Sequence, residues 1–244
     1  MPATDSDEYE QMKDLRPVYM SLVGGLVWVA TMTRHDIAFA VSQLARVLTN
    51  PGQRHFDAAI RVLLYLKTTQ KRLLSYKPDP KLGLQVFVDS DWSTKYSCFG
   101  AYFIFMGCPF YWFSKMQHSV SLSSAESEYF GAMLALKDLI FFRELLFVLG
   151  YLTKGPTAMF TDSKSAVDLS YDHVAFKNTK HILRAAEFLR DNVTKLVVAP
   201  SHLPGRVMIA DLLTKSLPRA TFNSLLTMLD EYSVLQQAAV VDKP

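Results

Sequence analysis

The chain has 244 residues, half of them hydrophobic, which is enough apolar material for one large globular domain or two smaller ones. Its formal net charge of +3 permits an acidic polymer such as nucleic acid as a partner but does not by itself indicate one. The apolar runs 22–30 and 145–152 are too short to cross a bilayer, and the acidic, polar first residues are unlike a signal peptide. We therefore expect an intracellular protein with no membrane partner.

The only two cysteines, Cys98 and Cys108, stand in apolar surroundings. Two cysteines without neighbouring ligand pairs form no zinc pattern, and they suggest no disulfide framework. This favours a reducing compartment, the cytoplasm in the first place and the nucleus as an alternative.

The first part of the chain has helical periodicity. Residues 1–16 form a charged lead-in, and apolar residues then recur at helical spacing from 19 to 68, interrupted at Pro51 and Gly52. We expect a small unit of three helices, with a basic, proline-containing linker over 69–82. The aromatic residues expected in its core are Trp28, Phe39 and Tyr65.

After residue 82 the spacing of the apolar residues changes from a helical period to a period of two. The pattern predicts strands over 84–89, 99–106 and 110–115, with the last running on toward Leu122 and a turn at 107–109 between the latter two. Three strands in this order pair antiparallel.

A long helix is predicted over 125–149, with Ser123 and Glu126 as a capping box. The segments expected after it are a strand over 157–161, helices over 164–169 and 179–192, a strand over 195–199, and helices over 207–216 and 219–232.

Four carboxylates stand where this arrangement would bring them together. Asp89 and Asp162 each follow a strand, and a strand–helix–strand crossover places such ends side by side at the carboxyl edge of the sheet. Glu128 lies in the first turn of the crossover helix, and Asp211 lies on a later helix. Because ionised carboxylates avoid each other unless a cation intervenes, the set predicts a site for Mg²⁺, with Mn²⁺ as a second choice.

Each carboxylate also has a purely structural interpretation. Glu126 reads as a helix cap and Asp91 as a turn residue. For the others the sequence leaves both interpretations open: a dipole-stabilising residue for Glu128, an N-cap for Asp162, and an ordinary surface pair with Lys215 for Asp211. The joint placement of the four carboxylates, and no one of them alone, indicates the metal site.

At these residues the chain resembles the carboxyl-terminal part of a copia-type LTR-retrotransposon polyprotein, namely the thumb or connection segment of its reverse transcriptase followed by its ribonuclease H domain. The resemblance covers roughly residues 17–230. The matching segments are YMSLVGGLVWVATMTRHDIAFAV at 19–41, HFDAAIRVLLYLK at 55–67, VFVDSDW at 86–92, LSSAESEY at 122–129, FTDSKSAV at 160–167, NTKHI at 178–182 and IADLLTKSLPR at 209–219.

The resemblance implies an α/β fold, a ribonuclease H-like mixed sheet of about five strands flanked by helices and preceded by a small helical unit. The implied organisation is a disordered lead-in (1–16), a thumb-like helical unit with its linker (17–82), a ribonuclease H-like domain (83–217) and a carboxyl-terminal helix and tail (218–244). The catalytic and metal-binding set would be Asp89, Glu128, Asp162 and Asp211, and His202 resembles the mobile histidine of cellular ribonucleases H.

The implied activity is endonucleolytic hydrolysis of the RNA strand of an RNA–DNA hybrid with two Mg²⁺ ions. The implied partners are the hybrid and a reverse-transcriptase palm domain in cis or in trans, inside the cell and within a virus-like particle. The residues expected to contact the nucleic-acid backbone are Lys115, Lys164, Lys177, Lys180, His181 and Arg184, for which a solvated basic face is the alternative.

The chain departs from the family in two places. Where relatives commonly read Arg-Ser-Thr-Ser-Gly before the second strand, this sequence has Tyr96-Ser-Cys-Phe-Gly100. The Tyr-X-Asp-Asp motif of the polymerase is absent, so this chain is not a polymerase by itself. The alternative function is a catalytically idle or domesticated fragment that binds nucleic acid or docks a polymerase.

Overall fold

The computed structural model describes residues 13, 15–92, 97–117, 124–151, 155–171 and 180–231, apart from the side chains of 124–125 and 180–183. Contacts between Cα atoms divide the chain into two compact units, Met1–Leu74 and Ser75–Pro244. Among the described residues, no helix combines the length and the apolar composition needed to span a membrane.

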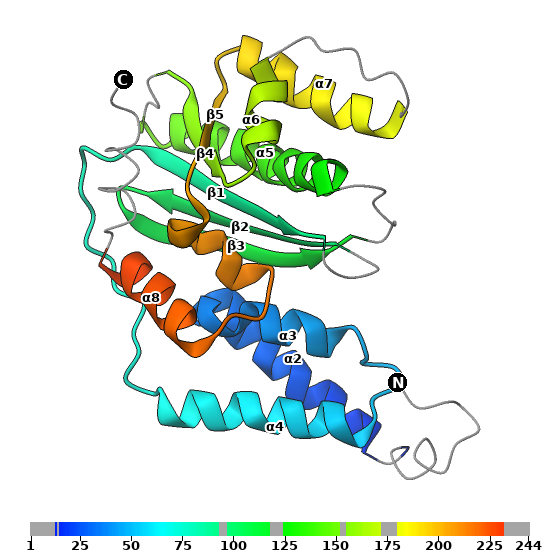
Figure 1. The fold of residues 1–244 in the computed structure, drawn as a ribbon. Helices are drawn as coiled ribbons and strands as arrows, with labels where there is room; N and C mark the ends of the chain where they lie inside the picture. Colours follow the sequence, from blue (N-terminus) through cyan, green and yellow to red (C-terminus); the bar gives the residue numbers. More distant parts are fainter. Residues whose placement is uncertain are drawn as a thin grey trace. The chain divides into compact units, whose positions relative to one another are not determined.

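The first unit is helical, as the periodicity predicts. It contains α2 (Arg16–Met32), a 3₁₀ turn η1 (His35–Ile37), α3 (Ala38–Ala45) and α4 (Gln53–Thr68) (Figure 1). Helix α2 buries the residues that recur on one of its faces, namely Tyr19, Val23, Leu26 and Ala30. The expectation that Trp28 belongs to the core is wrong: it is 67% exposed, because it lies off that buried stripe.

A buried ion pair links the start of η1 to the end of α4. The Arg34 guanidinium donates to both carboxylate oxygens of Asp36, at 2.9 and 2.7 Å. The Tyr65 hydroxyl donates to the same carboxylate at 2.7 Å. Arg34 also donates to the hydroxyl and the carbonyl oxygen of Thr69. The carboxylate of Asp36 is therefore buried with its partners in place.

The second unit is built on a mixed sheet of five strands, β1 (Leu84–Asp91), β2 (Cys98–Phe105), β3 (Cys108–Met116), β4 (Thr157–Thr161) and β5 (Val198–His202). The order across the sheet is β3-β2-β1-β4-β5. β1, β2 and β3 pair antiparallel, whereas β1 with β4 and β4 with β5 pair parallel. This mixed sheet flanked by helices confirms the predicted fold class and places β1 at its centre.

Helices cover both faces of this sheet (Figure 1). The long crossover helix α5 (Ser124–Val148) and α7 (Lys180–Thr194) cover one face, together with α6 (Lys164–Tyr171). On the other face lie η2 (Gly205–Val207), η3 (Ile209–Leu213) and α8 (Arg219–Asp230). The two faces of β1 alternate accordingly: Val86 and Val88 join the core beneath α5, and Asp89 turns toward η3.

Three local predictions in this unit are wrong. The hairpin turn is Met106-Gly107, because both residues adopt positive φ and Cys108 already pairs with Phe105. The last strand begins at Val198, since the chain first turns through Leu196 at positive φ. The segment around Asp211 is a 3₁₀ helix where an α-helix over 207–216 was expected.

Candidate metal centre

Three acidic side chains converge at the carboxyl end of β1. One carboxylate oxygen each from Asp89, Glu128 and Asp162 lies within 4.8 Å of the other two. Asp89 is almost fully buried at 2% exposure, on the central strand, whereas the other two are half-buried. These are three of the four carboxylates that the crossover argument predicts to meet.

The topology explains why they meet. β1 and β4 are adjacent and parallel, with Phe87 opposite Phe160, so Asp89 and Asp162 leave the sheet at the same edge. Helix α5 connects the antiparallel strands to β4, and Glu128, just after its first turn, comes to this edge. The hydroxyls of Ser90 on β1 and Ser127 on α5 are hydrogen-bonded to each other next to it.

The N-cap of α6 is Ser163. Its hydroxyl accepts a hydrogen bond from the backbone N–H of Ala166 at 3.3 Å, which is the capping interaction. This answers the structural alternative for Asp162, because the neighbouring residue caps the helix and leaves the Asp162 carboxylate directed to the cluster.

Asp211, the fourth predicted carboxylate, is connected to Asp89 by the side chain of Lys215. The Lys215 ammonium lies 2.9 Å from Asp211 Oδ1 and 3.5 Å from Asp89 Oδ2. The Thr214 hydroxyl donates to that same oxygen of Asp89. Asp211 does pair with Lys215, as its structural interpretation proposed, but the pair is not an ordinary surface pair because Lys215 also contacts Asp89.

Gly100 allows the η3 segment to come this close. It pairs directly with Asp89 across β1 and β2. A Cβ atom at this position would stand 2.6 Å from Leu213 Cβ and 2.8 Å from Thr214 Cγ2. Both of these atoms are near the backbone, so a larger residue would push the segment that carries Asp211, Thr214 and Lys215 away from Asp89.

The close approach raises the pKa of several carboxyl groups. Burial, followed by the negative charges of Asp89 and Asp162, raises the pKa of Glu128 to about 9. Burial and the charge of Asp89 raise the pKa of Asp211 to about 7, although the hydrogen bond from Lys215 opposes this. The pKa of Asp162 is also raised, chiefly by burial and then by Asp89. The cluster therefore concentrates more negative charge than its surroundings neutralise.

These groups fit a hard divalent cation. The converging atoms of Asp89, Glu128 and Asp162 are all carboxylate oxygens, and the cluster contains no thiolate or imidazole, which is a ligand set typical of Mg²⁺ or Mn²⁺. A cation among them would remove the repulsion that raises their pKa values.

The other residues considered for this site lie around it. His202 is exposed at the end of β5 and pairs with Thr161, one residue before Asp162. Asp91 is the last residue of β1, and neither it nor the buried Glu126 joins the acidic group found among the described residues. Ser123, the predicted capping partner of Glu126, lies outside the described residues.

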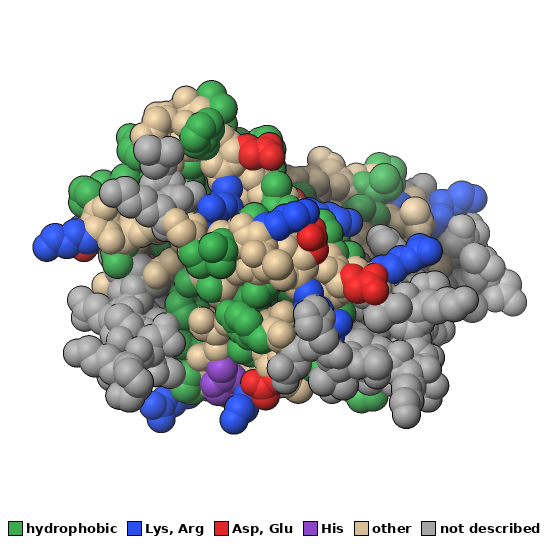
Figure 2. Space-filling model, turned by 90° about the horizontal axis from the view of Figure 1, so that it is seen from above, with side chains coloured by type: hydrophobic (Ala, Val, Ile, Leu, Met, Phe, Trp, Pro, Cys, Tyr) green, Lys and Arg blue, Asp and Glu red, His purple; other side chains and the backbone are tan. Residues whose placement is uncertain are grey.

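Three of the predicted backbone-contacting residues are described by the structure, and Lys115 lies apart from the other two. Lys115 on β3 lies opposite Phe99 on β2, and Phe99 packs beneath α5. The Lys115 side chain is therefore on the α5 face of the sheet, and its ammonium lies 4.0 Å from Asp138. Asp89 faces the other side. Lys164 is exposed at the start of α6, and Arg184 is exposed on α7. Lys177 and the side chains of Lys180 and His181 lie outside what is described. On the face in Figure 2, Lys and Arg side chains of the described residues do not merge into one continuous patch.

Comparison with known proteins identifies the relatives of the chain. No protein-family model matches it. It is 34% identical over 208 residues to the Retrovirus-related Pol polyprotein from transposon TNT 1-94 of Nicotiana tabacum, which is 84% of this chain and 16% of that protein. It is 31% identical over 210 residues to the Retrovirus-related Pol polyprotein from transposon RE2 of Arabidopsis thaliana, 84% of this chain and 14% of that protein.

The chain is a homologue of the Pol polyproteins of copia-type transposons. It spans 14% to 16% of the length of these two Pol relatives. Among solved structures, LC11-RNase H1 in complex with an RNA/DNA hybrid is similar at a TM-score of 0.43 and 14% identity, over 54% of this chain and 93% of that one. A TM-score this low has no bearing on function.

Two residues at the site of this Pol homologue were not recognised from the sequence as part of it. Thr214 contacts Asp89 from a segment 125 residues away in the chain, and Gly100 adjoins Asp89 on the neighbouring strand β2. The available signal was the spacing Asp211, Thr214, Lys215, which places three polar side chains on one side of a short helical turn within an otherwise apolar segment.

Proposed function

We propose that this chain is the ribonuclease H part of a retrotransposon Pol protein and hydrolyses the RNA strand of RNA–DNA hybrids with divalent metal ions. The observation that carries the proposal is the convergence of Asp89, Glu128 and Asp162 at the end of the central strand, in a homologue of Pol polyproteins. The raised pKa values of Glu128 and Asp211 support it, because a set of carboxylates held this close favours a bound cation.

The residues of the chain have distinct roles in this proposal. Asp89 lies between the other carboxylates and would contact both ions, Glu128 and Asp162 would hold one of them, and Asp211 would hold the other. Mg²⁺ ions held by these residues would supply the means to activate a water and to neutralise the charge that develops on the leaving 3′ oxygen. His202, exposed beside Asp162, is suited to assist release of the product.

The proposed partners follow from the same homology. The hybrid is the substrate, and a reverse-transcriptase palm domain is the proposed neighbour in cis or in trans, within an intracellular particle. The exposed cations Lys164 and Arg184 are the described candidates for phosphate contacts, which would weaken as salt rises.

Cleavage of an end-labelled RNA–DNA hybrid in Mg²⁺ tests the activity. We expect the wild-type chain to cut the RNA strand and Asp89→Asn to lose at least about a thousandfold in rate, because a neutral amide cannot replace a bridging carboxylate. The control is Asp191→Asn, which removes an exposed carboxylate paired with Lys195 on α7 and should cut at the wild-type rate.

Two results would contradict the proposal. Equal cleavage by the wild type and Asp89→Asn would show that the cut does not depend on this site. A wild-type chain that retards the hybrid in a gel without cutting it, in Mg²⁺ and in Mn²⁺, would favour the binding module instead.

A further inference from the structure

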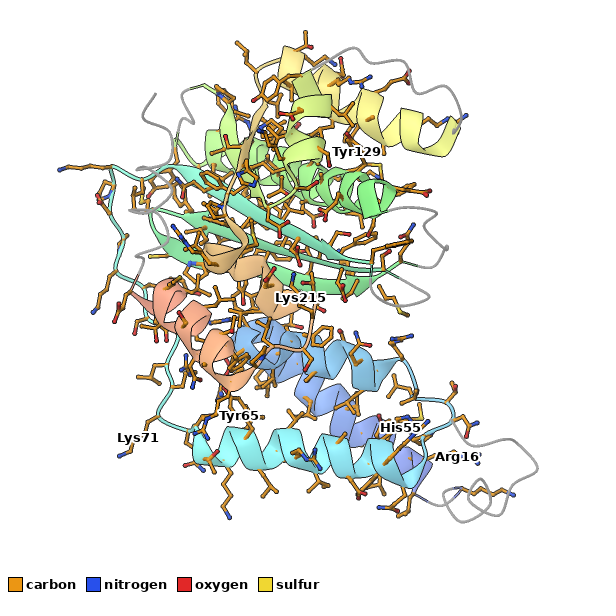
Figure 3. All side chains as sticks on the ribbon, viewed as in Figure 1. Arg16, His55, Tyr65, Lys71, Tyr129 and Lys215 are labelled. Atoms are coloured by element: carbon orange, nitrogen blue, oxygen red, sulfur yellow. The ribbon has the colours of Figure 1, made fainter. Side chains whose placement is uncertain are left out.

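Lys215 is the one cation that the described residues place within contact of two site carboxylates. Its ammonium lies 2.9 Å from Asp211 and 3.5 Å from Asp89, and its side chain is 33% exposed. Figure 3 shows it beside the η3 segment, on the other side of the sheet from Tyr129 of α5. A lysine is charged at neutral pH, and both carboxylates attract its ammonium.

We infer that Lys215 is a displaceable counter-ion, whose ammonium holds the cation position between Asp89 and Asp211 until a divalent ion takes it. The inference rests on the proposed metal-dependent function. An ammonium and a metal ion cannot occupy the same space between two carboxylates, so the lysine competes with the ion that Asp211 would hold.

The chemistry of the side chain suits this exchange. Lysine is a strongly hydrated point charge on a flexible four-carbon stem, and it binds carboxylates without the fixed two-point geometry of arginine. Because a third of the side chain already faces solvent, the ammonium can leave by rotation about its own bonds. A divalent ion brings twice its charge to the same oxygens and therefore gains more from them.

The exchange has two effects. Without metal, the lysine neutralises part of the charge that Asp89 and Asp211 concentrate, so the site can be formed before the ion arrives. With metal, the ion must first displace the lysine, which lowers its apparent affinity. Removing the ammonium should therefore strengthen metal binding and weaken the metal-free protein.

Calorimetric titration of the EDTA-stripped full chain with Mn²⁺ tests the inference. We expect Lys215→Met to bind Mn²⁺ about tenfold more tightly than the wild type at low salt, and to unfold at a lower temperature in EDTA. Lys215→Arg, which keeps the charge, should not show the gain. The control is Lys195→Met, because Lys195 makes the same i,i+4 contact with Asp191, at 2.6 Å, away from the site.

The outcomes separate this inference from the proposed function. If the wild type binds Mn²⁺ and cuts the hybrid but Lys215→Met binds no more tightly, only the counter-ion role is overturned. If neither protein binds Mn²⁺, the proposed function fails and the inference fails with it. Should Lys215→Met be poorly folded in EDTA, Lys215→Gln measured by the same titration decides the question.

Discussion

Two buried aspartates in this chain have opposite environments. Asp36, in the helical unit, accepts hydrogen bonds from Arg34 and Tyr65. Burial alone would raise its pKa, but these hydrogen bonds outweigh burial and hold the pKa below its usual range. Asp89, in the sheet unit, is as deeply buried but lies among Glu128, Asp162 and Asp211, two of whose pKa values rise to about 9 and about 7.

The difference is whether the charge of the buried carboxylate is already paired within the protein. The Asp36 carboxylate has a permanent cation two residues away and needs nothing from outside. The cluster around Asp89 has one lysine among several carboxylates, an arrangement that is compatible with binding a divalent cation. Perturbed carboxyl groups of this second kind gather at functional sites.

The largest expected effect concerns Asp36, whose charge is already paired. Asp36→Ala would leave the Arg34 guanidinium buried without its carboxylate, which should cost about 3 to 5 kcal/mol of the free energy of unfolding. Urea denaturation followed by circular dichroism measures this. Asp57→Ala, which removes an exposed aspartate of α4 that accepts a hydrogen bond from Gln53, should change stability by less than about 0.5 kcal/mol. A similar small loss for Asp36→Ala would show that the buried pair contributes no more than a surface one.

A smaller loss of stability is expected when the close packing of η3 against Gly100 is disturbed. Gly100→Ala would force its Cβ against Leu213 and Thr214, and should cost about 2 kcal/mol of stability while reducing the rate of hybrid cleavage. Gly83→Ala is the control, because a Cβ there meets nothing within 4 Å. Wild-type stability and cleavage in Gly100→Ala would mean that η3 need not approach β2 so closely.

The smallest expected effect is a gain in stability, in the variant Glu128→Gln. The pKa of Glu128 is higher in the folded chain, about 9, than its ordinary value of 4.5. The folded state therefore holds a proton that the unfolded state releases, and stability falls as pH rises between these values. Glu128→Gln carries no such charge, so in EDTA at about pH 8 it should be more stable than the wild type by about 1 kcal/mol.

Thermal unfolding at two pH values checks whether Glu128→Gln is more stable than the wild type. The advantage of Glu128→Gln should shrink at about pH 5, because close to the ordinary pKa of 4.5 the unfolded wild type also begins to hold the proton. In Mg²⁺ it should also shrink, since only the wild type is stabilised by the bound ion. A variant that is less stable than the wild type in EDTA at about pH 8 would contradict the crowding of negative charge around Asp89.

Much of the sheet could be predicted from local pattern. The apolar segment ending in Asp89 is a strand by its β-branched residues, and the crossover rule brings Asp162 beside it. The details that failed depend on backbone conformations that the residue types do not announce. Met106 and Leu196 adopt positive φ, which is uncommon for such side chains, so the turn and the start of β5 were misplaced.

The parts of the site that were missed are long-range contacts. Thr214 reaches Asp89 across 125 residues of chain, and Gly100 matters only because Leu213 packs on it. No periodicity within a single segment carries this information. Trp28 failed for the converse reason: an aromatic residue in an apolar helix is expected inside, yet the buried stripe of α2 runs along another face.

The carboxylates of the cluster are dispersed along the chain, on β1, on α5, directly after β4 and on η3, and this dispersal has a consequence during synthesis. A growing polypeptide has Asp89 early but lacks Asp162 until β4 has been made, and it receives Asp211 and Lys215 later still. A partly translated chain therefore cannot assemble the proposed cutting centre. If the chain has the proposed activity, the order of its residues would keep that activity from appearing until translation is almost complete.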